Sequence, residues 1–136
     1  ILHGQTGAGK TYNALRIQRR IAEKMFATLD AEGKVRLSYL ELNHSGKLPE
    51  LVQDGKAVEC ANLEDMLGQL HFAEVHRSSS ETSLHEASSR SHALCKLEKL
   101  SKESQVQSSA TIVDLAGNER SLDSFQNRGA NMQETK

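Results

Sequence analysis

The sequence predicts an α/β fold in which helices flank a central β-sheet, and three observations support this prediction. A glycine-rich stretch, Gly4-Gln5-Thr6-Gly7-Ala8-Gly9-Lys10-Thr11, joins a short apolar segment to a long segment with helical periodicity. Strand-like and helix-like segments then follow one another along the chain. An apolar strand near the end of the chain closes on Asp114, with Gly117 three residues later. A chain of 136 residues is one domain or part of one.

The glycine-rich stretch fits the phosphate-binding pattern of Gly, four residues, Gly, Lys and then Ser or Thr. Glycine allows the backbone N–H groups of such a loop to approach a polyphosphate, and the helix that follows adds the positive end of its dipole. We expect Lys10 to reach the β- and γ-phosphates and the Thr11 hydroxyl to bind Mg²⁺. The predicted nucleotide-binding residues are Gly4, Gln5, Thr6, Gly7, Ala8, Gly9, Lys10 and Thr11.

The first half of the chain predicts a strand, a helix and a second strand. Ile1-Leu2-His3 is typical of the end of a strand that leads into the loop. Apolar residues recur at helical spacing from residue 11 to about residue 29, with a basic run mostly on the other side that favours a solvated face over a partner surface. Residues 35–42 are rich in β-forming types and predict a strand. Residues 43–56 carry turn signals and predict a loop or an irregular edge.

The second half predicts a helix, a long loop and a β-hairpin. Asn62, with Asp65 three residues later, is an N-cap signal for a helix to about His76. Residues 77–92 are polar and dense in serine, so we expect a loop. Residues 93–100 and 106–115 predict two antiparallel strands around a short polar turn.

Composition limits the classes of function. The formal net charge of −1 gives no general attraction to nucleic acid, and no segment approaches the length and apolarity of a membrane span. The two cysteines lie far apart without metal-ligand spacing, which favours buried, reduced thiols in a cytosolic protein. The six histidines also lack metal-ligand spacing.

Three segments together resemble the kinesin motor domain. They are Gly4 to Thr11, Ser88-Ser89-Arg90-Ser91-His92, and Asp114-Leu115-Ala116-Gly117-Asn118-Glu119, which are similar to that family's phosphate loop, switch I and switch II. Residues 35–42 resemble a strand of the same family, and residues 133–136 resemble the entry to its switch II helix. The resemblance implies an incomplete P-loop NTPase (kinesin-like) three-layer fold with a central mixed β-sheet. Residues 1–136 are then expected to be a partial motor domain.

The resemblance also implies a role for each matching residue. Thr11, Ser89 and Asp114 are expected at the Mg²⁺ shell, Asp114 through water. Ser88 resembles the serine that orders the attacking water, and Gly117 is expected to donate a backbone N–H to the γ-phosphate. Arg90 and Glu119 resemble the ion pair that closes switch I on switch II. The implied catalytic residues are therefore Ser88, Arg90, Glu119 and Gly117.

The implied function is the ATP-binding core of a microtubule-based motor that couples ATP hydrolysis to movement. The implied cofactors are ATP and Mg²⁺, and the implied partner is tubulin in microtubules, contacted through the complete motor domain. No nucleic-acid or membrane partner is expected, the implied location is the cytoplasm and its cytoskeleton, and the oligomeric state is left open. We expect the isolated 136-residue chain to be poorly stable and weakly active or inactive.

Two alternatives stay open at the level of sequence. A degenerate kinesin-like module could bind nucleotide or tubulin without productive hydrolysis. His85, three residues before the first switch I serine, where the family usually has Asn, motivates this reading. An unrelated P-loop kinase or GTPase is the other alternative, although the chain contains no guanine-reading Asn-Lys-x-Asp stretch.

Overall fold

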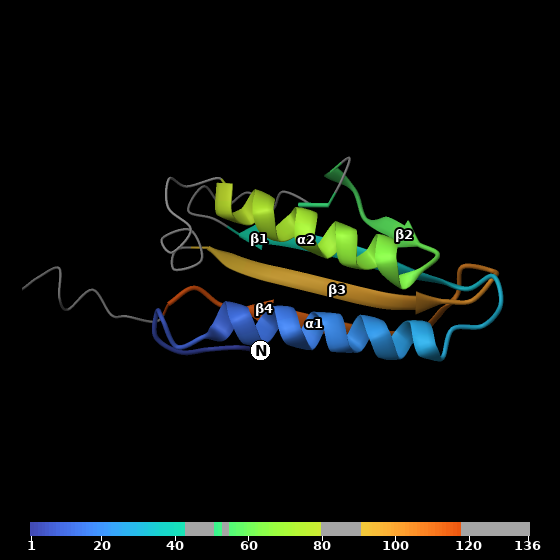
Figure 1. The fold of residues 1–136 in the computed structure, drawn as a ribbon, viewed down its shortest axis with the longest axis horizontal. Helices are drawn as coiled ribbons and strands as arrows, with labels where there is room; N and C mark the ends of the chain where they lie inside the picture. Colours follow the sequence, from blue (N-terminus) through green and yellow to red (C-terminus); the bar gives the residue numbers. More distant parts are fainter. Residues whose placement is uncertain (43–50, 53–54, 80–90, 118–136) are drawn as a thin grey trace, which may run out of the picture.

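A computed structural model describes residues 1–42, 51–52, 55–79 and 91–117. In this part of the chain two helices and four strands follow one another (Figure 1). The elements are α1 (Lys10–Ala27), β1 (Lys34–Leu42), β2 (Val58–Cys60), α2 (Leu63–Ser79), β3 (His92–Leu100) and β4 (Val106–Asp114).

The strands form one sheet in the order β2-β1-β3-β4, and each neighbouring pair is antiparallel. The long pairing of β1 with β3 places Leu37 opposite Leu97 and Tyr39 opposite Cys95. A parallel bridge joins Leu2 to Asp114, with Leu2 N–H donating to the Val113 carbonyl at 2.8 Å. The four-stranded sheet is thus antiparallel, and the isolated parallel bridge places the segment before the glycine-rich loop beside the end of β4.

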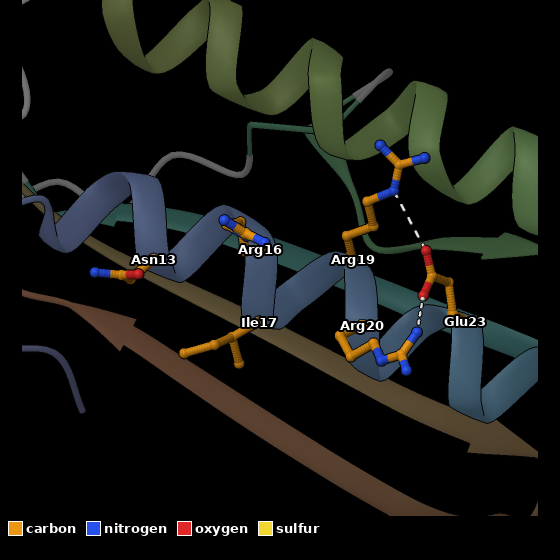
Figure 2. A pocket seen from close by; sticks show the side chains of 6 residues that line it. All are labelled: Asn13, Arg16, Ile17, Arg19, Arg20 and Glu23. Atoms are coloured by element: carbon orange, nitrogen blue, oxygen red, sulfur yellow. Dashed lines mark hydrogen bonds and ion pairs between the residues drawn. The ribbon is translucent and has the colours of Figure 1, made fainter.

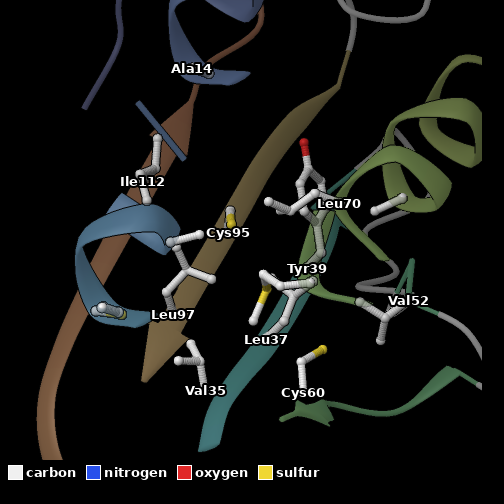
Figure 3. Close-up of a cluster of buried hydrophobic side chains, with 14 of the residues drawn as sticks. Ala14, Val35, Leu37, Tyr39, Val52, Cys60, Leu70, Cys95, Leu97 and Ile112 are labelled. Carbon is white, nitrogen blue, oxygen red and sulfur yellow. The ribbon is translucent and has the colours of Figure 1, made fainter. Parts of the chain in front are cut away.

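Both helices lie on the same face of the sheet, where the core is located. The buried positions alternate along β1 and β3, because successive side chains of a strand point to opposite faces. Ala14, Ala22 and Met25 of α1 and Met66, Leu70 and Ala73 of α2 belong to the same buried cluster as these strand residues (Figure 3). The described residues thus supply the sheet and one helical layer of the predicted fold.

The opposite face of the sheet has a charged half and an apolar half. Arg36 Nη2 lies 3.0 Å from Glu59 Oε1, and Arg36 Nη1 lies 3.5 Å from Glu98 Oε2. Nearer the end of β4, Leu40, Leu94 and Val113 are in register across three strands and are half-buried. The charged half suits contact with water, since cross-strand pairs of opposite charge are favourable in a solvated sheet face.

One helix boundary follows from the local sequence, and another is stabilised by a residue remote in the chain. Asn62 Oδ1 accepts the Asp65 backbone N–H at 2.9 Å, so the predicted N-cap of α2 is confirmed. At the C-terminal end of α1, Lys99 Nζ donates to the Thr28 carbonyl and satisfies a terminal acceptor of that helix.

Two details differ from the prediction. The helix α2 continues to Ser79 and β3 begins at His92, so the predicted loop over residues 77–92 is too long at both ends. Arg77 is buried and hydrogen-bonded, and those contacts stabilise one more helical turn, which composition alone does not reveal. The three-residue strand β2 was not predicted, because it is too short to show an alternating pattern.

Candidate functional site

The glycine-rich loop leads directly into α1. Gly7 and Gly9 have φ angles of 80° and 75°, a left-handed conformation that glycine adopts without steric cost. Gly9 is the N-cap of α1, and its carbonyl accepts the first helical hydrogen bond from Asn13 at 3.0 Å. Lys10 Nζ donates to the Gln5 carbonyl at 2.8 Å, so its ammonium lies against the loop itself. The loop thus presents a positive charge and a helix N-terminus at the same place, which suits an anion.

Thr11 connects this loop to the end of β4. Its hydroxyl donates to Asp114 Oδ2 at 2.8 Å, although the two residues are 103 positions apart. The parallel bridge between Leu2 and Asp114 explains this contact, since it places the segment before the loop beside the end of β4. The structure therefore brings together two of the three residues predicted at the metal shell.

Asp114 is also held by Arg77, at the C-terminal end of α2. Arg77 Nη1 donates to Asp114 Oδ2 at 2.7 Å, and Arg77 Nη2 donates to the Ser91 carbonyl at 3.0 Å. Both side chains are buried, so their attraction is weakly screened by water. The Arg77 side chain therefore links α2 to the end of β4 and to the residue before β3.

A small residue of β3 lies beside the partner of Arg77. The helix α2 packs on β1 and β2, whereas Asp114 is on β4, so the arginine side chain has to extend past the start of β3, where it also binds the Ser91 carbonyl. The residue of β3 in register with Asp114 is Ala93, which is buried. A methyl side chain at this position leaves room for the guanidinium to reach the carboxylate.

The predicted switch segments also meet in the part that the structure describes. Ala116 N–H donates to His92 Nδ1 at 3.0 Å, which joins the last residue of the serine-rich motif to the Asp-Leu-Ala-Gly motif. Gly117 follows directly and is half-buried. Ser88, Ser89, Arg90, Glu119 and His85 lie outside the described residues.

The oxygens at this place fit a hard divalent cation. Asp114 Oδ1 is buried and makes no hydrogen bond within the described residues, while Oδ2 already accepts from Thr11 and Arg77. Hydroxyl and carboxylate oxygens are the ligands that Mg²⁺ and Mn²⁺ take from proteins, usually with several waters retained. Among the described residues, no cluster of three or more His, Cys, Asp or Glu side chains is arranged for a metal.

Sequence reasoning missed three buried polar residues near this site. Gln18, Tyr39 and Arg77 are 1%, 1% and 4% exposed. Helical spacing could have indicated the burial of Gln18 and Arg77. Gln18 is in phase with the buried Ala14 and Ala22 of α1, and Arg77 is in phase with the buried Leu70 and Ala73 of α2. Burial raises the pKa of Tyr39 to about 12, against a smaller lowering by the charge of Arg77.

A separate hollow of about 530 Å³ is lined by side chains of α1 (Figure 2), and none of the residues that contact Asp114 lines it. Glu23 Oε1 and Oε2 lie 3.4 Å and 3.0 Å from Arg19 and Arg20, and these hydrogen bonds lower the pKa of Glu23, with Arg20 the larger cause. These ion pairs are exposed and fit the predicted solvated helix face. The lining residues are Asn13, Arg16, Ile17, Arg19, Arg20 and Glu23.

No helix in the described ranges has the length and apolarity needed to cross a membrane.

Comparison of the sequence with known proteins gives one family. The sequence model described as the kinesin motor domain matches residues 38–136. This match includes both predicted switch segments and begins after the glycine-rich loop. The chain is 30% identical to diatom spindle kinesin-1 of Cylindrotheca fusiformis over 144 residues, which cover 91% of this chain and 23% of that protein. It is 32% identical to kinesin-like protein NACK1 of Nicotiana tabacum over 148 residues, which cover 87% of this chain and 15% of that protein.

Comparison of the structure with solved structures identifies the kinesin fold as well. A fast kinesin, solved to examine its ATPase mechanism and its interactions with microtubules, matches with a TM-score of 0.66 and 22% identity. The match covers 87% of this chain and 44% of that one. The Drosophila protein Kin10/NOD, solved with divalent manganese and ADP, matches with a TM-score of 0.58 and 23% identity over 88% of this chain and 48% of that one. The chain thus spans under a quarter of these two curated relatives and under half of either solved kinesin.

Proposed function

Because the chain belongs to the kinesin motor-domain family, we propose that it is the nucleotide-binding core of a microtubule motor that hydrolyses ATP. In this proposal residues 1–136 are part of one motor domain. Its partner is tubulin in microtubules, and its place is the cytoplasmic cytoskeleton.

One observation carries the proposal: the hydroxyl of Thr11 lies 2.8 Å from Asp114 Oδ2. The family match begins after the glycine-rich loop, so the assignment of that loop needs independent support. The contact supplies it, because it joins the first residues of α1 to an acidic residue within the matched segment. A phosphate loop and a metal-binding aspartate have to be neighbours if one Mg²⁺ is to serve both.

Each described residue has a task in this proposal. The loop N–H groups and Lys10 bind the phosphates of ATP or ADP, while Thr11 and Asp114 hold the shell of a Mg²⁺ ion, Asp114 through water. When bound, this ion neutralises charge that develops on the phosphates. Gly117 is proposed to donate its backbone N–H to the γ-phosphate. The manganese and ADP in the Drosophila structure support a nucleotide with a divalent cation as the ligand.

The remaining roles belong to residues outside the described ranges. Ser89 is proposed for the metal shell, and Ser88 for ordering the attacking water. Arg90 and Glu119 are proposed to pair when the γ-phosphate is present and to separate after its loss, which converts hydrolysis into a conformational change. The hydrogen bond between Ala116 and His92 supports this proposal, because it holds the ends of the two segments together.

Two glycines offer a matched test of nucleotide binding. Gly7 and Gly55 have φ angles of 80° and 62°, and a Cβ added to either meets no heavy atom within 4 Å. Alanine at either position is therefore expected to cost a similar amount of stability, about 1–2 kcal/mol. Only Gly7→Ala places a Cβ in the phosphate loop and is expected to weaken Mg·ADP binding about 10- to 100-fold.

The measurement is a titration of each variant of the full-length protein with Mg·ADP. Equal losses of affinity in Gly7→Ala and Gly55→Ala would contradict a ligand at the loop. Hydrolysis is a separate measurement, since tubulin should raise ATP turnover and Glu119→Ala should abolish it. Turnover that does not respond to tubulin would count against a motor, and turnover that survives Glu119→Ala would favour an unrelated P-loop enzyme. The absence of measurable turnover would favour the degenerate alternative.

A further inference from the structure

We propose that His92 is a positioning residue, whose ring nitrogen Nδ1 holds the backbone before Gly117 so that the Gly117 N–H meets the terminal phosphate of ATP. The proposal deepens the proposed function, since the Gly117 N–H has this ligand only if a nucleoside triphosphate binds at the glycine-rich loop. The hydrogen bond through which His92 acts can be tested without any nucleotide.

The side chain of His92 takes the place of a strand carbonyl at the end of the sheet. The pairing of β3 with β4 ends where Ala93 lies opposite Asp114, so His92 lies beside the residues that follow β4. There Ala116 N–H donates to His92 Nδ1 at 3.0 Å. Both residues are half-buried, and a backbone N–H that is shielded from water needs an acceptor. The histidine ring supplies one beyond the end of the strand ladder.

This hydrogen bond determines which ring nitrogen of His92 carries the proton. A backbone N–H can only donate, so Nδ1 is the acceptor and carries no proton. In a neutral imidazole the proton is then on Nε2, whereas in a charged ring both nitrogens are donors and neither can accept. His92 therefore makes this contact only as a neutral ring with its proton on Nε2.

The backbone before Gly117 is held from two sides. Leu115 N–H donates to the carbonyl of Leu2, in the segment before the glycine-rich loop, at 3.1 Å. Ala116 N–H donates to His92 from the side of β3. Because peptide groups are planar, only the φ and ψ angles of Ala116 separate this second fixed peptide from the peptide that carries the Gly117 N–H. His92 thus restricts the directions in which the Gly117 N–H can point.

The held backbone lies next to the start of α1. Asp114, three residues before Gly117, accepts the Thr11 hydroxyl at 2.8 Å. A donor that is already oriented when an anion arrives needs no reorganisation, and this makes its interaction with the anion stronger. The γ-phosphate distinguishes ATP from ADP, so the contribution of His92 should appear in the preference for the triphosphate.

The test compares His92→Leu with His92→Asn. Both replacements branch at Cγ and have nearly the same shape, but only asparagine carries an acceptor, Oδ1, on the same carbon that bears Nδ1 in histidine. Asparagine is disfavoured in strands, so a purely structural role of His92 would make His92→Asn the more damaging change. Positioning predicts the opposite order. The control for loss of a histidine is His71→Leu, at an exposed position of α2.

The first measurements use the full-length protein without nucleotide. Alanine and histidine are isotopically labelled, and the signals of Ala116 and His92 are assigned by nuclear magnetic resonance from Ala116→Gly and His92→Asn variants. The ring spectrum should show Nδ1 of His92 without a proton. Hydrogen exchange of the Ala116 amide should become about threefold to tenfold faster in His92→Leu, as the loss of one hydrogen bond requires, and stay unchanged in His92→Asn and His71→Leu. A proton on Nδ1, or unchanged exchange in His92→Leu, would overturn the proposal.

The second measurement compares the affinity of the full-length protein for Mg·ADP with its affinity for the magnesium complex of the β,γ-imido analogue of ATP, which is not hydrolysed. His92→Leu should weaken binding of the triphosphate about threefold to tenfold and change ADP binding by less than about twofold, because the Gly117 N–H meets only the γ-phosphate. His92→Asn should restore the triphosphate affinity. Equal losses for both nucleotides, or a loss in His92→Asn as large as in His92→Leu, would show a general packing defect and contradict positioning.

Failure of the proposed function gives a different result. An unmodified protein that binds neither nucleotide would overturn the nucleotide site together with the role of His92 in it, even with the hydrogen bond to Ala116 confirmed. Normal binding of both nucleotides, with an unchanged preference for the triphosphate in His92→Leu, would overturn the role of His92 alone.

Discussion

Replacing Arg77 by alanine tests the central ion pair. The substitution removes the donors that reach Asp114 Oδ2 at 2.7 Å and the Ser91 carbonyl at 3.0 Å. Asp114 stays buried, and the Thr11 hydroxyl is its remaining hydrogen-bond donor among the described residues, so a carboxylate loses its counter-charge in a region that water does not reach.

Removing one partner of a buried ion pair costs about 3–5 kcal/mol, because the other charge stays uncompensated. Typical domains are stable by about 5–15 kcal/mol, so this single change removes a large share of the free energy of unfolding. Arg36 provides the control. It pairs with Glu59 and Glu98, but its side chain is 32% exposed, and exposed pairs contribute about 0–1 kcal/mol. Arg36→Ala should therefore cost less than about 1 kcal/mol.

The assay is urea unfolding of the full-length protein, followed by circular dichroism. With a denaturant dependence of about 2 kcal/mol per molar urea, the unfolding midpoint of Arg77→Ala should fall by about 2 M, and that of Arg36→Ala by less than about 0.5 M. The double variant Arg77→Ala with Asp114→Ala should recover part of the loss, because it removes the uncompensated charge. A midpoint for Arg77→Ala close to that of Arg36→Ala would refute the reasoning.

Three further predictions follow from buried positions. Ala93→Leu should crowd the buried ion pair of Arg77 and Asp114, and the overpacking alone should lower the free energy of unfolding by about 1–3 kcal/mol. Ala57→Leu, at an exposed position, should change it very little. Thermal unfolding of both variants checks this prediction. The pKa of Tyr39 is raised to about 12, so the stability that its burial provides is complete below pH 10 and is lost as pH rises toward 12. This loss should approach about 3 kcal/mol and be absent in Tyr39→Phe, with tyrosinate absorbance as the monitor. Burial raises the pKa of Cys60 to about 11, so iodoacetamide at neutral pH should alkylate neither it nor buried Cys95 until the protein unfolds; stoichiometric labelling of the native protein would contradict this.

The sequence predicts most of the framework because its signals are local. The spacing of apolar residues predicts both long helices, and the β-forming residue types over residues 35–42 predict β1. The glycine-rich motif and the acidic end of β4 are local patterns too. Thr11 and Asp114 were each predicted to serve one Mg²⁺ shell, which requires them to be neighbours, and the Thr11 hydroxyl lies 2.8 Å from Asp114 Oδ2.

The supporting residues could not be predicted in the same way, because their partners are remote in the chain. Arg77 resembles a solvated residue at a helix end until Asp114, 37 residues away, is placed beside it. Gln18 is polar, and yet its side chain is buried at a core position of α1. Helical phase indicates that such a residue is buried, but it does not identify the group that satisfies it.

The separation of 103 positions between Thr11 and Asp114 has a consequence for the folding kinetics. The β3–β4 hairpin and both helices form from residues that are neighbours in the chain. The bridge from Leu2 to β4 and the contact of Thr11 with Asp114 instead close a loop of more than 100 residues. Closing so long a loop is entropically costly until the strands between are in place, so these contacts should form after the folding transition state. A ligand that binds there would therefore slow unfolding while leaving the folding rate almost unchanged.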